Sequence, residues 1–122
     1  MNKIYETKVT KIGVNVLDFY NEKILILFKD NAPAELIDYC ILHSLNKLYG
    51  EIKEGDILRI NEKEFKITAV GDLVNKNLKA LGHICLKFDG STEAELPGSL
   101  YVEDKEIPKI NIGDIIIIRK IV

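Results

Sequence analysis

The sequence predicts a mainly β protein, a small closed or partly open β-barrel with Greek-key-like connections and one short helix. Short apolar or alternating runs recur at intervals of about ten residues and are separated by Gly, Asn, Asp and Pro, as in all-β barrels and sandwiches. Two runs, residues 24–28 and 115–118, are continuously apolar, which is typical of strands covered on both faces. One small open sheet cannot cover so many apolar faces. We therefore expect the sheet to close on itself, and a second subunit to cover part of what is left.

Length and charge restrict the class of protein. The 122 residues suit a single domain, residues 1–122, with one hydrophobic core. Lys and Arg number 17 against 19 Asp and Glu, and the charges are interspersed, so no basic patch marks a nucleic-acid partner. The sequence has no long apolar run and no signal-peptide pattern, and its two cysteines form no C-x-x-C pair. These features predict a cytoplasmic protein that does not insert into a membrane.

The first expected strand and the first expected hairpin follow from alternation and turn residues. Three apolar or weakly polar side chains alternate with polar neighbours near the N-terminus, as in a half-buried strand: Tyr5, Thr7 and Val9. Further along, two apolar runs at 57–60 and 65–70 flank four polar residues, 61–64. This arrangement predicts two antiparallel strands joined by a four-residue loop.

Residues 33–48 fit two structures. Their apolar positions have the period of a helix, but the run 39–42 also fits a buried strand. Pro33 suits the first position of a helix, because proline lacks the amide hydrogen that is unpaired there. We expect a helical turn at about 33–37 and then a strand to about His43, with a continuous helix as the alternative.

A short helix is predicted over residues 72–81. Asp72 can cap its N-terminus, and Gly82 lies just past its end. Its apolar positions have the 3.6-residue period: Leu73, Val74, Leu78 and Leu81. Two more strands are expected on either side of the Asp-Gly and Pro-Gly turn signals that follow, at 83–88 and 99–103.

Two histidines, His43 and His83, lie at the ends of apolar runs, where a side chain can be both held and reached. A neutral imidazole is a nucleophile that can accept a phosphoryl group and release it to the next acceptor. A second imidazole nearby could donate a hydrogen bond to phosphate oxygens. The alternative is that both are hydrogen-bonded structural residues.

A metal site is another alternative, since the two histidines and the two cysteines are zinc-ligand types: Cys40, His43, His83 and Cys85. On a strand, Cys40 and His43 would point to opposite faces, so the four would converge only if residues 40–43 were helical or kinked. The glycines form no nucleotide-binding motif. We therefore expect no metal and no cofactor.

Several short segments, in order along most of the chain, resemble one bacterial family. They are residues 32–36, 39–40, His43, 68–71, 77–78, 81–83, 88–90, 94–95 and 97–98. Together they resemble the glucitol/sorbitol-specific enzyme IIA component of the phosphoenolpyruvate-dependent sugar phosphotransferase system. The resemblance implies a cytoplasmic phosphocarrier with a β-barrel-like fold that forms dimers. It would take a phosphoryl group from the carrier protein HPr and pass it to a cysteine of the membrane sorbitol permease, enzymes IIB and IIC.

The resemblance places the phosphoacceptor on His43 and, by analogy with enzyme IIA proteins that pair two histidines, a phosphate-stabilising role on His83. Some family members have another histidine two positions after the acceptor, where this chain has Leu45. No phosphate-binding role is therefore carried over to that position. We expect a modest apolar docking rim around His43 from Leu42, Leu45 and Leu48. A regulatory or ligand-binding barrel without catalysis is the alternative function.

Overall fold

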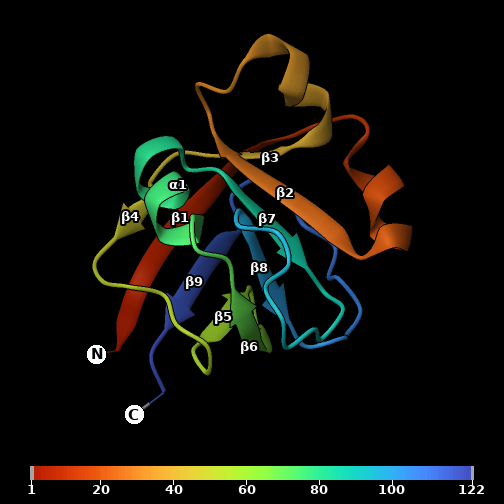
Figure 1. The fold of residues 1–122 in the computed structure, drawn as a ribbon. Helices are drawn as coiled ribbons and strands as arrows, with labels where there is room; N and C mark the ends of the chain where they lie inside the picture. Colours follow the sequence, from red (N-terminus) through yellow and green to blue (C-terminus); the bar gives the residue numbers. More distant parts are fainter. Residues whose placement is uncertain (1, 122) are drawn as a thin grey trace.

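The computed structural model describes residues 2–121, in which eight strands close into a barrel and a ninth short strand lies beside them (Figure 1). The strands are β1 (Lys3–Ile12), β2 (Ile24–Lys29), β3 (Ile41–His43), β4 (Lys47–Leu48), β5 (Ile57–Ile60), β6 (Lys63–Val70), β7 (Ile84–Lys87), β8 (Ser99–Val102) and β9 (Ile115–Arg119). Around the barrel the order is β3, β2, β7, β8, β6, β5, β9 and β1. The pairs β2–β3 and β7–β8 are parallel, and the other pairs are antiparallel.

The long strand β1 closes the barrel. It pairs with β9 over Lys3 to Lys8, and further along it pairs with β3, where Val9 lies opposite His43. The register shifts between Val9 and Lys11, a bulge of the kind that bends a strand at a barrel corner. On its other side β3 pairs with β2. Closure therefore fixes His43 between β1 and β2.

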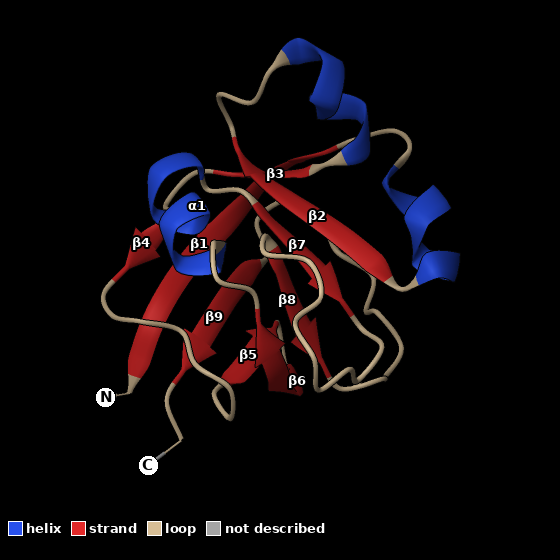
Figure 2. Ribbon diagram, in the orientation of Figure 1, coloured by secondary structure: helices blue, strands red, loops and turns tan. Residues whose placement is uncertain are grey.

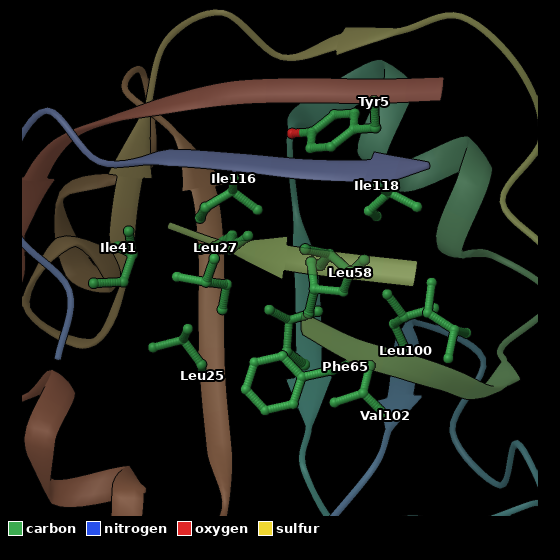
Figure 3. Close-up of a cluster of buried hydrophobic side chains, with 14 of the residues drawn as sticks. Tyr5, Leu25, Leu27, Ile41, Leu58, Phe65, Leu100, Val102, Ile116 and Ile118 are labelled. Carbon is green, nitrogen blue, oxygen red and sulfur yellow. The ribbon is translucent and has the colours of Figure 1, made fainter. Parts of the chain in front are cut away.

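The barrel interior is filled by alternate side chains of the strands, which Figure 3 shows converging from opposite walls. Phe65 and Phe88 meet edge to face, with ring centroids 5.0 Å apart. The labelled core residues are Tyr5, Leu25, Leu27, Ile41, Leu58, Phe65, Leu100, Val102, Ile116 and Ile118. All of these side chains are almost completely buried, so the barrel is packed through its centre.

Strand β2 is covered on both faces within this one chain. Leu25 and Leu27 lie in the main core, whereas Phe28 belongs to a second apolar cluster with Cys40 and Leu42. Ile37 packs against this second cluster from outside. The continuous apolar run at residues 24–28 is therefore explained by closure of the barrel and by an outer layer.

One α-helix and two 3-10 helices flank the barrel (Figure 2): α1 (Val74–Leu81), η1 (Val16–Glu22) and η2 (Ala34–Tyr39). Helix α1 buries Val74 and Leu78 in the main core. Gly82 ends it in the left-handed conformation, φ +62°, and its N–H donates to the carbonyl of Leu78 at 2.9 Å. No helix within residues 2–121 is long and apolar enough to cross a membrane.

The structure confirms the mainly β barrel and the division of residues 33–48. Helix η2 and strand β3 occupy the places of the expected helical turn and strand, and the continuous helix is wrong. Cys40, between the two elements, is extended, with φ −117° and ψ 151°. This residue ends the helix and leads into the strand that carries His43.

Three local expectations differ from the structure. Asp72 does not cap α1, because Leu73 occupies the N-cap position. The N–H of Leu73 donates to the carbonyl of Pro97 at 2.8 Å, so a contact with Pro97 fixes the start of the helix. The turn between β5 and β6 is shorter than four residues, because Asn61 adopts φ +56° and β6 begins at Lys63. Helix η1 was not expected from the sequence.

Candidate functional site

His43 is the last residue of β3, and its backbone is held from both sides. Its neighbours across the two strand pairs are Val9 in β1 and Lys29 in β2. Its carbonyl accepts a hydrogen bond from the N–H of Asp30 at 2.9 Å. The side chain is completely buried. The imidazole is therefore immobilised, and the protein supplies its hydrogen-bond partners.

Both ring nitrogens of His43 are hydrogen-bonded. Nδ1 lies 2.6 Å from the hydroxyl oxygen of Thr7, and Nε2 lies 2.7 Å from the carbonyl oxygen of Gly82. A carbonyl oxygen only accepts, so Nε2 carries the proton. The Thr7 hydroxyl accepts the backbone N–H of Asn46 at 3.0 Å and donates its own proton to Nδ1 of the neutral ring. The network thus assigns a single tautomer to the resting site.

The hydrogen bonds around His43 form a closed circuit through Asn46. The side-chain amide of Asn46 donates to the carbonyl of Leu78 at 2.9 Å, and that carbonyl also accepts the N–H of Gly82. On its other side the Asn46 amide oxygen accepts the hydroxyl of Tyr5 at 2.7 Å. Asn46 has φ +44°, a conformation that Asn tolerates better than most residues. The circuit ties the imidazole to the end of helix α1.

Burial favours the neutral form of this imidazole. It lowers the pKa of His43 below the usual 6.5 and outweighs the opposing effects of the hydrogen bond to Gly82 and the charge of Asp30. The positive charge of Lys29 lowers the pKa further. At neutral pH the ring is therefore uncharged and keeps one lone pair.

The end of helix α1 fits closely over His43. A Cβ at Gly82 would lie 3.0 Å from Cε1 of His43 and 2.8 Å from Cβ of Lys29. Glycine is therefore needed at position 82 both for its positive φ and for its lack of a side chain. Lys29 is half-buried, and its positive charge acts on the His43 imidazole.

The structure does not place His83 in this network. Its half-buried ring stacks on Phe28 in the outer cluster, with centroids 4.8 Å apart and planes at 25°. Burial lowers the pKa of His83 as well. Because Phe28 belongs to the outer cluster, the His83 ring lies on the outer side of the barrel wall, whereas His43 points inward to Thr7.

The four zinc-ligand types do not gather at one point. Cys40 is buried in the outer cluster, and both it and Cys85 are free thiols. Residues 2–121 contain no group of three or more His, Cys, Asp or Glu side chains that could hold a metal ion. A hollow of about 470 Å³ does open between η1 and residues 106–110, but neither histidine lines it.

Comparison with known proteins identifies the family of this chain. The family model described as "PTS system glucitol/sorbitol-specific IIA component" matches residues 4–117. The chain belongs to this family. It is 39% identical over 102 residues to the glucitol/sorbitol-specific EIIA components of Escherichia coli K12 and of Shigella flexneri, which covers 84% of this chain and 83% of each relative.

A solved structure of the same kind shares the fold. The crystal structure of a PTS system IIA component from Enterococcus faecalis V583 has a TM-score of 0.80 and 32% sequence identity with this chain. The match covers 91% of this chain and 96% of that one. The resemblance inferred from short sequence segments is thus confirmed at the level of the family.

Of the three leucines expected to form a docking rim in this glucitol/sorbitol-specific enzyme IIA component, one is exposed. Leu45 is 41% exposed, whereas Leu42 is buried in the outer cluster and Leu48 packs against the main core. Leu81, at the end of α1, is 47% exposed and adjoins Gly82 in sequence. The exposed apolar side chain nearest to His43 in sequence is therefore Leu45, and the one at the C-terminal end of α1 is Leu81.

Sequence reasoning missed four residues of the site: Thr7, Lys29, Asn46 and Gly82. The signal for Thr7 was its inward position between Tyr5 and Val9, where a polar side chain needs a partner. Gly82 was visible only as a helix end. Lys29 and Asn46 gave no signal, because their relation to His43 depends on strand register and on a left-handed turn.

Proposed function

We propose that this protein is a phosphocarrier in which His43 accepts a phosphoryl group from phospho-HPr. The group then passes to a cysteine of enzyme IIB of the sorbitol/glucitol permease, which couples uptake of the sugar through enzyme IIC to its phosphorylation. The observation that carries the proposal is the neutral, immobilised imidazole of His43 in a chain of this family. A neutral imidazole at neutral pH has the lone pair that phosphoryl transfer requires. The carrier acts in the cytoplasm.

The attacking atom in this proposal is Nε2. Nδ1 faces Thr7 inside the barrel, whereas Nε2 faces the carbonyl of Gly82 at the end of α1, where Lys29 is half-buried and Leu81 is exposed. The lone pair of Nε2 bonds to phosphorus as the phosphorus–nitrogen bond of phospho-HPr breaks, and the electron pair of that bond stays on the donor imidazole. The donor imidazole carries a proton on its other nitrogen, so it leaves neutral. No metal or nucleotide takes part.

Transfer requires the end of helix α1 to move. The Gly82 carbonyl oxygen, 2.7 Å from Nε2, occupies the place that phosphorus would take, and there is no room at Gly82 even for a methyl group. Before this nitrogen can attack, its proton must pass to water admitted when Gly82 withdraws, and Nδ1 must take up a proton from water, so the ring stays neutral. Docking of HPr against Leu45 and Leu81 would supply the free energy for withdrawing Gly82. Gly82 can act as the hinge because glycine accepts a wide range of backbone angles.

In this proposal, two side chains stabilise the phosphoryl group after this movement. Lys29 is beside His43 in the parallel pair β2–β3 and carries its ammonium group on a flexible stem. His83 follows Gly82 directly and would move with it. We assign both a phosphate-stabilising role, with Lys29 supplying charge and His83 supplying a hydrogen bond.

The test is intact-mass spectrometry at alkaline pH after mixing the protein with phosphoenolpyruvate, enzyme I and HPr. The variants are His43→Gln and His83→Gln. Glutamine at position 43 retains an amide N–H for the Gly82 carbonyl and an oxygen for Thr7, so it limits the loss of stability. A melting curve for each variant shows that it is folded.

A gain of one phosphoryl group that disappears in His43→Gln and is only slowed in His83→Gln supports the proposal. A gain that survives in His43→Gln but disappears in His83→Gln would move the acceptor to His83. No gain in the wild type, with active donors, would refute the phosphocarrier role and leave the regulatory or ligand-binding barrel.

A further inference from the structure

We propose that Thr7 is the positioning residue of the phosphoacceptor, because its hydroxyl can serve the His43 ring in both of the tautomers that phosphoryl transfer needs. This inference rests on the proposed function of His43. Thr7 is completely buried in the middle of β1, and its oxygen is 2.6 Å from Nδ1. It lies on the inward face of the strand with Tyr5 and Val9, so it has no access to solvent.

In the resting tautomer Thr7 is a donor to the ring. Nε2–H donates to the carbonyl of Gly82, and Nδ1 has the lone pair. The backbone N–H of Asn46 donates to one lone pair of the Thr7 oxygen and cannot accept a hydrogen bond itself. The hydroxyl proton of Thr7 is therefore available for Nδ1. This arrangement holds the plane of the ring and keeps Nε2 protonated and unreactive.

In the reactive tautomer Thr7 becomes an acceptor. For Nε2 to attack phosphorus, the ring must carry its proton on Nδ1 and its lone pair on Nε2. A hydroxyl oxygen has two lone pairs, so Thr7 can accept Nδ1–H while it still accepts the N–H of Asn46. The same contact also stabilises the positive charge that develops on the ring as the bond between Nε2 and phosphorus forms. The Thr7 oxygen keeps its position in both states, and only its hydroxyl proton has to rotate away from Nδ1.

Nearby groups do not duplicate this role. The Tyr5 hydroxyl donates to the side chain of Asn46, and burial raises the pKa of Tyr5, so it stays protonated. The Asn46 side chain is occupied by Tyr5 and by the carbonyl of Leu78. Among the groups of this circuit, only the Thr7 hydroxyl can both donate to Nδ1 and accept from it.

The variants that test the proposal are Thr7→Val, which keeps the shape of the side chain and removes the hydroxyl, and Thr7→Ser, which keeps the hydroxyl. Thr10→Val is the matched control. Thr10 lies on the same strand, and its buried hydroxyl has no hydrogen-bond partner in the described part of the chain. In the assay with phosphoenolpyruvate, enzyme I and HPr, we expect Thr7→Val to slow phosphorylation by about tenfold or more. Thr7→Ser and Thr10→Val should stay within about twofold of the wild type.

The second readout is the ¹⁵N chemical shifts of the imidazole ring, which distinguish protonated from unprotonated nitrogens and respond to hydrogen bonds. In the resting wild type, Nε2 should be protonated and Nδ1 unprotonated and hydrogen-bonded. In Thr7→Val the ¹⁵N chemical shift of Nδ1 should move to the value of an unprotonated nitrogen that accepts no hydrogen bond. Thr7→Ser should restore the wild-type chemical shift. A merely structural role in β1 would not produce this pattern.

The outcomes separate this inference from the proposed function. If the wild type gains no phosphoryl group, the function of His43 is refuted, whatever the Thr7 variants do. If the wild type is phosphorylated and folded Thr7→Val reacts at the same rate, only the role of Thr7 is refuted. Should Thr7→Val fail to fold, the wild-type spectrum still decides, because a resting ring with its proton on Nδ1 would overturn the assignment.

Discussion

The carbonyl oxygen of Gly82 accepts a hydrogen bond from Nε2 of His43 at 2.7 Å, and this single contact joins the end of helix α1 to the end of strand β3. The two residues are 39 positions apart in sequence. The contact protects the imidazole in the resting state and, in the proposed mechanism, must be broken before transfer. The strength of the contact therefore affects both the stability of the fold and the reactivity of the site.

Replacing Gly82 by alanine should destabilise the protein by about 2 to 4 kcal/mol. Part of this cost comes from the positive φ of +62°, and part from the contacts of the new Cβ with Lys29 and His43. Denaturant unfolding of Gly82→Ala measures the loss.

Gly90→Ala is the control for backbone strain, since Gly90 has φ +68° but a Cβ there would make only ordinary contacts, the nearest at 3.5 Å from Asp104 N. We expect about 1 to 2 kcal/mol for Gly90→Ala. Equal losses in the two variants would show that the close fit over His43 contributes nothing to stability.

The free energy of unfolding should decrease as the pH falls below about 6.5. Burial lowers the pKa of His43 in the folded protein below the 6.5 of the unfolded chain, so the unfolded state binds the proton first. The resulting stability is complete above about pH 6.5 and is lost as the pH falls from there through the folded pKa. One proton contributes a slope of at most about 1.4 kcal/mol per pH unit.

His43→Gln removes this proton and should have a shallower dependence on pH than the wild type. The remaining dependence includes His83, whose pKa burial also lowers. Denaturant unfolding at several pH values measures the two slopes. The prediction is wrong if the variant and the wild type lose stability in parallel.

Thr10→Val should leave the free energy of unfolding unchanged or raise it by up to about 1 kcal/mol. The Thr10 hydroxyl is buried and has no partner within residues 2–121, so its removal abolishes an uncompensated polar group. Valine also suits a strand. Thermal or denaturant unfolding of Thr10→Val and of Thr7→Val measures the contrast, because the hydroxyl of Thr7 has two hydrogen bonds to lose, one with His43 and one with Asn46. A loss as large as that of Thr7→Val would contradict this account.

The strands of this barrel were predictable because their signals are local. Tyr5, Thr7 and Val9 alternate with polar residues, and they do point inward. The start of α1 was not predictable in the same way, since the carbonyl of Pro97, 24 positions from Leu73, replaces the local cap that Asp72 suggested. Tertiary contact here overrides a capping signal.

The site was predictable only in part. His43 stood out because imidazole is rare in this chain and ends an apolar run. Its partners Thr7 and Gly82 are 36 and 39 positions away, and only the closure of the barrel brings all three together. His83 was expected near the acceptor, but its ring contacts Phe28 instead. Side chains alternate between the two faces of the sheet as the chain enters β7, and this alternation turns His83 toward Phe28.

Two neighbouring charges should shift the pKa of His43 in opposite directions. Asp30 raises it and Lys29 lowers it, so Asp30→Asn should lower the pKa and Lys29→Met should raise it. Both residues lie at the end of β2 beside His43, and neither belongs to the hydrogen-bond circuit of the ring. NMR titration of the His43 ring in the two variants measures both shifts, and the variants serve as controls for each other.

The same pair separates the role of Lys29 in transfer from its effect on protonation. If Lys29 stabilises the phosphoryl group, Lys29→Met should slow phosphorylation by HPr about tenfold even at a pH where His43 is fully neutral. Asp30→Asn should leave the rate there unchanged or raise it, because it removes a negative charge near the incoming phosphate. A Lys29→Met protein that reacts normally at high pH would limit Lys29 to tuning the imidazole.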